Sequence, residues 1–202
     1  SEILLIYSGS TPIDPPVVPE QQLSHDKYVT LKDDGTYDLT LTVSGAVGSE
    51  THKQMLDVIY VLDKSGSMDK NMANNSGSRG ERRDAAGNAI TSLTEKLANN
   101  KDLDVRFSLV TFSSDALVTQ GWTSSKTDIK NSAYPRSNGG TNYQAGIRYA
   151  KNLLESKRQG AVTAVIFVSD GNPTAWYGYG GSVEGGSETT NNINTALSAA
   201  KT

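Results

Sequence analysis

The sequence predicts an α/β fold with a doubly wound, mostly parallel, Rossmann-like sheet, preceded by a short β segment. From residue 53 onward, short apolar runs alternate with amphipathic helical patterns, and this order produces a parallel sheet with helices on both faces. The run at 162–168 is hydrophobic at nearly every position, which is typical of a strand covered on both faces. Polar residues follow the apolar strands, at the edge where such sheets bind ligands.

The composition excludes several classes of function. The 202 residues carry a formal net charge of -3, which argues against nucleic acid as the main partner. No apolar stretch approaches the roughly 20 residues that a membrane-spanning helix needs. The sequence contains no cysteine and two histidines, His25 and His52, which we interpret as surface residues. A catalyst based on cysteine or histidine is therefore not expected.

Residues 1–26 are predicted to form a Pro-rich leader or linker. Prolines at positions 12, 15, 16 and 19 favour an extended polyproline conformation and cannot sit inside a sheet. Within this segment, residues 3–7 are interpreted as an edge strand or as an ordered remnant of an upstream element.

Residues 27–52 are predicted to contain a β-hairpin that belongs to a flanking β-domain. Two β-prone runs, 28–31 and 36–43, flank Asp34-Gly35, which is a strong turn signal. Apolar and polar residues alternate along the second run, so one face is expected to be buried. A lone hairpin is marginally stable in water, so we expect it to dock on other structure.

Residues 53–202 are predicted to form the α/β domain itself. We expect strands at 57–62, 105–112 and 162–168, a short strand at 116–118, a Gly/Tyr-rich loop at 175–186, and helices from 81 to the Asn99-Asn100 pair, at 124–132, from 143 to about 154 and at 187–201. The aromatic residues of the 175–186 loop fit either a binding surface or a self-packed loop. No further strand follows the last helix, which would leave the apolar run 162–168 with an unpaired edge. We therefore expect the chain to be a C-terminally truncated fragment that ends before the final strands of its domain.

Five oxygen-bearing residues are predicted to meet at the carboxyl edge of the sheet. Asp63, Ser65 and Ser67 follow one buried strand, Thr141 precedes a helix, and Asp170 follows the most apolar strand. Carboxylates and hydroxyls are hard ligands that suit Mg²⁺, Mn²⁺ or Ca²⁺. The first three residues alone would equally fit a polar turn after a strand. Together the five residues predict a site for a divalent cation.

The five residues, in this order and spacing, resemble the metal-ion-dependent adhesion site of von Willebrand factor type A domains. This resemblance covers residues of about 53–202. It implies that Ser65 and Ser67 bind the cation directly, that Thr141 does so directly or through water, and that Asp63 and Asp170 act mostly through water. The expected ion is Mg²⁺, with Mn²⁺ or Ca²⁺ as alternatives, and its vacant position would accept a carboxylate from a partner.

The segment 27–45 resembles the lead-in to this domain in pilus-tip and other surface adhesins of Gram-positive bacteria. That resemblance implies an extracellular adhesin on the bacterial cell wall or pilus, with a host cell-surface or extracellular-matrix protein and other pilus subunits as its partners. It also implies that Lys27 or Lys32 could form an isopeptide bond. Two alternatives remain open: an intracellular subunit of an assembly or chelatase-like machine, and a metal-dependent hydrolase. The second lacks a phosphate-binding loop and a placed base or nucleophile, so we expect no enzyme.

Overall fold

The computed structural model describes residues 3–6, 24–31, 37–44, 53–73, 76–77 and 79–201. The chain divides into two compact units, one made of residues 1–9 and 53–202 and the other of residues 10–52. The remaining predictions for the first 52 residues, which concern the Pro-rich segment, the turn of the hairpin, and the side chains of His25, Lys27, Lys32 and His52, lie outside the described residues.

The smaller unit contains a β-hairpin. Strands β2 (Ser24–Leu31) and β3 (Tyr37–Ser44) pair antiparallel, with Val29 opposite Leu39. The hairpin predicted from the two β-prone runs is thus confirmed.

The larger unit contains a five-stranded sheet in the order β1-β7-β4-β5-β6. Its three central strands, β4 (Gln54–Asp63), β5 (Leu103–Phe112) and β7 (Val162–Val168), are parallel to one another. The edge strands β1 (Ile3–Ile6) and β6 (Ala116–Thr123) run antiparallel to their neighbours. The predicted α/β class with a mostly parallel sheet is confirmed.

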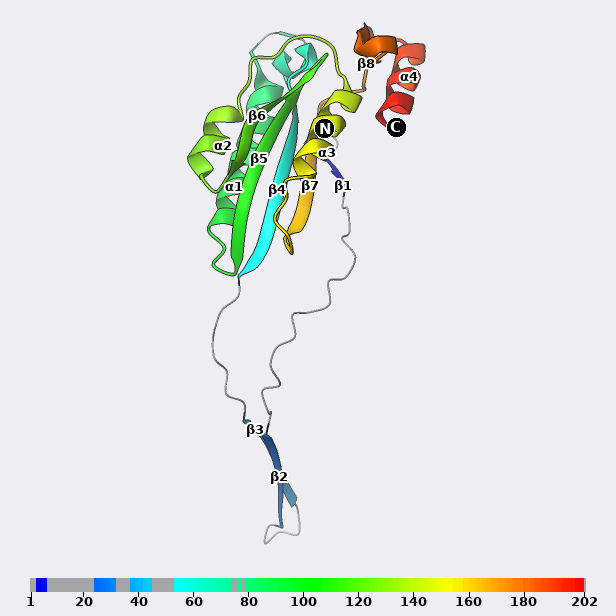
Figure 1. Ribbon diagram of the computed structural model, residues 1–202. Helices are drawn as coiled ribbons and strands as arrows, with labels where there is room; N and C mark the ends of the chain where they lie inside the picture. Colours follow the sequence, from blue (N-terminus) through cyan, green and yellow to red (C-terminus); the bar gives the residue numbers. More distant parts are fainter. Residues whose placement is uncertain are drawn as a thin grey trace. The chain divides into compact units, whose positions relative to one another are not determined.

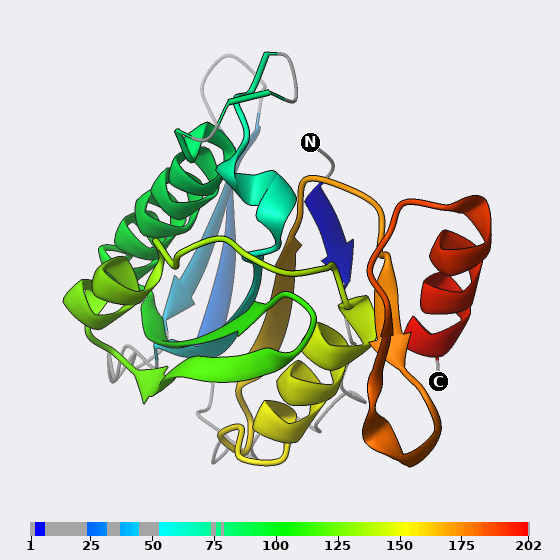
Figure 2. The same ribbon diagram turned by 90° about the horizontal axis from the view of Figure 1, so that it is seen from above.

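Helices cover both faces of this sheet, as Figure 2 shows from above. Helices α1 (Glu81–Ala98) and α2 (Lys126–Ser132) lie on one face, and α3 (Tyr143–Leu154) lies on the other (Figure 1). Successive residues of β4 point to opposite faces of the sheet: Tyr60 packs in the core beneath α1, and Val61 packs in the core beneath α3. Both residues are fully buried, which explains why the strand is apolar at consecutive positions.

Three features of the larger unit differ from the prediction: the pairing of the run 162–168, the structure of residues 175–186, and the length of β6, which extends to Thr123 and not only to residue 118. The run 162–168 does not leave an unpaired edge, because β1 pairs with it, Ile3 opposite Val168 and Ile6 opposite Val165. Residues 175–186 are not a plain loop: β8 (Ala175–Tyr177) and β9 (Val183–Gly185) form a small antiparallel ribbon around a short 3-10 turn. Helix α4 (Thr190–Ala200) follows and lies beside β8 (Figure 1).

A network of charged residues lies where the parallel strands begin. Asp57, at 0% exposure, accepts hydrogen bonds from Arg106 Nε and Nη2 at 2.9 and 2.8 Å, and from Arg158 N and Nε at 2.8 Å. Arg106 also stacks on the ring of Trp122. Burial acts to raise the pKa of Asp57, but the hydrogen bonds from the two arginines outweigh it and hold that pKa below its ordinary value. The network joins β4, β5, β6 and the segment before β7.

No helix among the described residues is long and apolar enough to cross a membrane.

Candidate metal site

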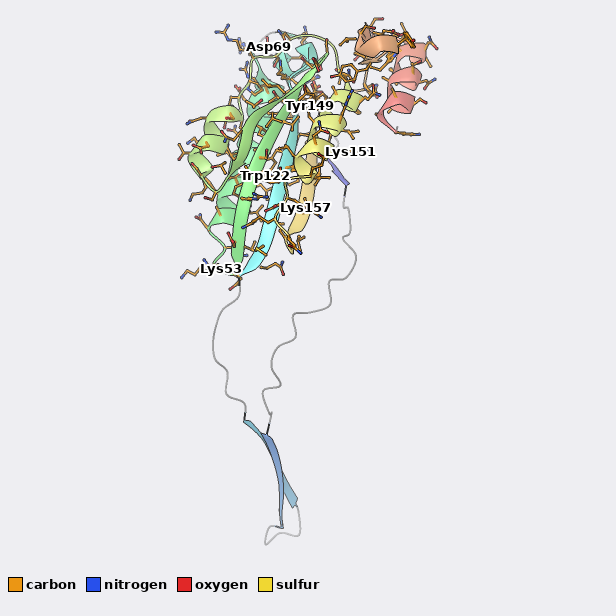
Figure 3. The ribbon with its side chains drawn as sticks, in the orientation of Figure 1. Lys53, Asp69, Trp122, Tyr149, Lys151 and Lys157 are labelled. Carbon is orange, nitrogen blue, oxygen red and sulfur yellow. The ribbon has the colours of Figure 1, made fainter. Side chains whose placement is uncertain are left out.

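The first part of the site is the turn that follows β4. Asp63 is the last residue of the strand and is fully buried. Its Oδ1 accepts a hydrogen bond of 2.7 Å from the backbone N–H of Ser65, which fixes the turn. The short helix η1 (Gly66–Asp69) begins directly afterwards and carries Ser67. Figure 3 labels Asp69, the end of this helix, at the opposite end of the domain from Lys53, which precedes β4.

Hydrogen bonds join this turn to the residues that follow β7. The hydroxyl groups of Ser65 and Ser67 lie 3.0 Å apart, and Ser67 Oγ donates to Asp170 Oδ1 at 2.8 Å. Ser169 Oγ donates to Asp63 Oδ2 at 2.6 Å. Four of the five predicted ligands are thereby brought together by contacts between two loops that lie more than a hundred residues apart in the sequence.

Thr141 lies in the loop before α3, and this loop also contacts the turn after β4. The N–H of Gly66 donates to the carbonyl of Gly139 at 3.0 Å. Thr141 is itself held from the other side, because its N–H donates to Thr174 Oγ1 at 3.2 Å and its carbonyl accepts the N–H of Thr174 at 2.8 Å. The next residue, Asn142, caps α3 by accepting the N–H of Ala145. The loop that carries the fifth predicted ligand thus contacts the turn after β4 through Gly139, while Thr141 itself is hydrogen-bonded to Thr174.

Burial dominates the electrostatics of Asp63. It raises the pKa of this carboxyl to about 6, although hydrogen bonds from Ser169 and Ser65 act to lower it, and the nearby charge of Asp170 raises it further. Two carboxylates close together repel each other, so a cation between or beside them relieves the repulsion.

One cation of the protein already contacts the cluster. Arg82, in the first turn of α1, places Nη1 at 2.7 Å from Asp170 Oδ2. On the same side a pocket of about 200 Å³ opens, and its lining is mostly methionine, alanine and valine side chains. Arg82 and Asp170 line this pocket too.

The donor set fits a hard divalent cation. The Ser67 hydroxyl donates its proton to Asp170, so it accepts the hydrogen bond from Ser65 and keeps one lone pair for an ion. No group of three or more His, Cys, Asp or Glu residues in the described part of the chain could hold a metal. A cation site at this position would combine serine and threonine hydroxyls with the carboxylates of Asp63 and Asp170, and oxygen ligands of this kind suit Mg²⁺ and not a soft metal.

Three contributing residues were missed from the sequence. Ser169 directly precedes Asp170, and a hydroxyl beside a predicted ligand is a signal that could have identified it. Arg82 lies outside the apolar stripe of its helix, and nothing in the sequence pairs it with Asp170. Thr174 likewise gives no local signal for its contact with Thr141.

The chain has recognisable relatives among protein families and solved structures. The sequence model of the von Willebrand factor type A domain matches residues 58–172, more than half of the chain. No curated protein matches the sequence of this chain. The structure is similar to the vWF domain of the type V pili tip protein Mfa5 from Porphyromonas gingivalis, with a TM-score of 0.51 and 23% identity over 62% of this chain and 40% of that one.

Two further structures share the fold. The three N-terminal domains of Mfa5 match with a TM-score of 0.55 and 23% identity, over 82% of this chain and 28% of that one. The PilB minor pilin from Streptococcus sanguinis matches with a TM-score of 0.59 and 16% identity, over 89% of this chain and 63% of that one. The chain thus spans less than two thirds of each of these structures, and the likeness concerns the fold. With the family match over residues 58–172, the chain belongs to the von Willebrand factor type A domain family.

Proposed function

We propose that this chain is a cell-surface adhesin domain that binds a host cell-surface or extracellular-matrix protein through a divalent cation. The observation that carries the proposal is the hydrogen-bonded row from Ser65 through Ser67 to Asp170, which links the ends of β4 and β7. Such a row of hydroxyls and carboxylates at the carboxyl edge of a parallel sheet is suited to a hard cation.

Within this proposal each residue has a role. Ser65 and Ser67 bind the ion directly through their hydroxyl groups, Thr141 does so directly or through water, and Asp63 and Asp170 act mostly through water. Mg²⁺ is the expected ion, with Mn²⁺ and Ca²⁺ as alternatives. When bound, the ion supplies an electrophilic position that accepts a carboxylate of the partner. Because the serine and threonine ligands are neutral, they leave most of the charge of the ion to that carboxylate.

The proposed setting is the bacterial cell surface, on a cell wall or pilus, with other pilus subunits as further partners. The similarity of fold to pilus proteins supports this setting. The proposed role is binding and not catalysis, since the donor set offers hydroxyls and carboxylates without a base or nucleophile of the kind that hydrolysis requires.

The first experiment tests the cation. The chain is stripped with chelator, and its melting temperature is measured with and without Mg²⁺, Mn²⁺ or Ca²⁺, for the wild type and for Ser67→Ala. Saturation at about a hundred times Kd adds roughly 2.7 kcal/mol to stability, which is several degrees for a domain of this size. Ser67→Ala should lose most of the shift. Ser124→Ala, at an exposed position before α2, is the matched control and should keep it.

The second experiment tests adhesion. Binding of the chain to immobilised collagen, fibrinogen and fibronectin is measured in Mg²⁺, in chelator, and with Asp63→Ala, whose fold is checked by circular dichroism. We expect binding to at least one of these proteins that chelator and Asp63→Ala both abolish. Adhesion that is unchanged in chelator would refute the metal mechanism.

A further inference from the structure

The contact between Arg82 and Asp170 places a fixed positive charge in the wall of the proposed cation site. Arg82 Nη1 lies 2.7 Å from Asp170 Oδ2, and the two side chains are only 18% and 7% exposed. Arg82 Nε also donates to the carbonyl of Asn71 at 3.3 Å, which directs the guanidinium toward Asp170. The other carboxylate oxygen of Asp170 accepts the hydroxyl of Ser67, so both of its oxygens are engaged.

The neighbouring arginine provides a contrast on the same helix. Arg83 pairs with Asp69 at 3.5 Å and with Asp84 at 3.1 Å, and neither of these carboxylates belongs to the proposed donor set. Among the ion pairs in the described part of the chain, the Arg82–Asp170 pair is the one that includes a proposed ligand.

A count of charges shows what Arg82 changes. Asp63 and Asp170 carry two negative charges and Arg82 one positive charge, so the contacting groups sum to minus one. A divalent cation would bring this sum to plus one. Without Arg82 the loaded site would be neutral. In a site this poorly exposed, one unit charge changes an ionic affinity by about tenfold or more.

We propose that Arg82 determines the charge preference of the site: it weakens binding of the divalent cation and strengthens capture of the partner's carboxylate. This inference rests on the proposed function. Arg82 leaves the cation-loaded site with a positive charge that an acidic ligand neutralises. In the cation-free protein the same guanidinium is the counter-charge of Asp170 and stabilises the domain.

A purely structural role for Arg82 makes the opposite prediction for the cation. If the guanidinium only held Asp170 in place, its removal would loosen a ligand, and the affinity for Mg²⁺ would fall together with the affinity for carboxylate. The sign of the change in Mg²⁺ affinity therefore separates the two roles.

The test compares Arg82→Gln with the wild type and with Arg83→Gln as the matched control. Three quantities are measured: the melting temperature in chelator, the Kd for Mg²⁺ by calorimetry, and the shift in melting temperature that sodium acetate adds over sodium chloride at saturating Mg²⁺. We expect Arg82→Gln to melt lower than Arg83→Gln in chelator, to bind Mg²⁺ about tenfold more tightly, and to lose most of the acetate shift. Arg83→Gln should match the wild type in the last two measurements.

Each other result has a defined meaning. Unchanged or weaker Mg²⁺ binding by Arg82→Gln overturns the inference, and so does an acetate shift that is absent in the wild type or retained in the variant. A wild type that binds no divalent cation overturns the proposed function as well. If Arg82→Gln does not fold, Arg82→Met takes its place, because its apolar side chain can pack beside Met68 and Met72 in the adjoining pocket.

Discussion

Replacing the buried carboxylate of Asp57 should destabilise the domain strongly without touching the candidate site. Asp57→Asn keeps the shape of the side chain and removes its charge. Arg106 and Arg158 would then face a neutral amide in place of the carboxylate that now accepts four hydrogen bonds from them. Breaking a buried ion pair in this way leaves charged groups without a partner.

The magnitude follows from the burial of the three residues. Loss of one partner from a buried pair costs about 3–5 kcal/mol. Arg106 and Arg158 are 22% and 24% exposed, so water can solvate part of their charge. We therefore expect a loss of about 2–3 kcal/mol in the free energy of unfolding, or roughly 5–10 °C in melting temperature. Asp104→Asn is the matched control, because Asp104 also pairs with Arg158 but is 53% exposed, and its loss should cost under about 1 kcal/mol.

Asp57 also makes the stability of the folded protein depend on pH. The pKa of Asp57 lies below its ordinary value of 3.8 in the folded protein, so the stability that its charge contributes is fully present above 3.8 and is lost as the pH falls through the lower folded value. Urea unfolding at pH 7 and in the acid range should show a steeper acid loss for the wild type than for Asp57→Asn. Equal stability of the two proteins at pH 7, or parallel acid profiles, would refute this account of the network.

Two further substitutions test the packing of the helices on the sheet. Gly87→Ala should lower the free energy of unfolding, measured in urea, by about 1–3 kcal/mol, because its Cβ would lie 2.8 Å from the carbonyl oxygen of Ala133. Gly121→Ala is the control and should be nearly neutral, since no atom lies within 4 Å of the added carbon. Tyr60→Phe removes a buried hydrogen bond of 2.9 Å to Thr94 and should cost about 1 kcal/mol by the same measurement. An unchanged midpoint for Tyr60→Phe would mean that Thr94 bonds elsewhere without loss.

The central strands could be predicted because a strand that is buried on both faces has apolar residues at consecutive positions. Val58 to Leu62 are all at 0% exposure, and their unbroken apolar run reflects helices on both sides. The edge strand β6 was predicted too short, ending at residue 118 and not at Thr123, because its second half contains polar residues and glycine. The β8–β9 ribbon was missed for a related reason, since its Gly-rich sequence shows no alternation.

The candidate ligands could be predicted because their side-chain chemistry recurs at strand ends, where position is set by topology. Their partners could not. Arg82 and Asp170 are separated by 88 positions, and Asp57 and Arg158 by 101. No local pattern distinguishes an arginine that meets such a carboxylate from one that faces water.

The pairing of β1 with β7 makes the larger unit discontinuous along the chain. The polypeptide contributes one strand to the sheet, departs to form the unit of residues 10–52, and returns at residue 53. The smaller unit is consequently an insertion, and the backbone passes between the two units twice. Cleavage of one of these two connections would leave the units covalently joined through the other. In folding, β1 must find β7 across some 160 positions, whereas β4, β5 and β7 are joined by shorter helical crossovers. Entropy of loop closure therefore favours late docking of this strand onto an already assembled parallel core.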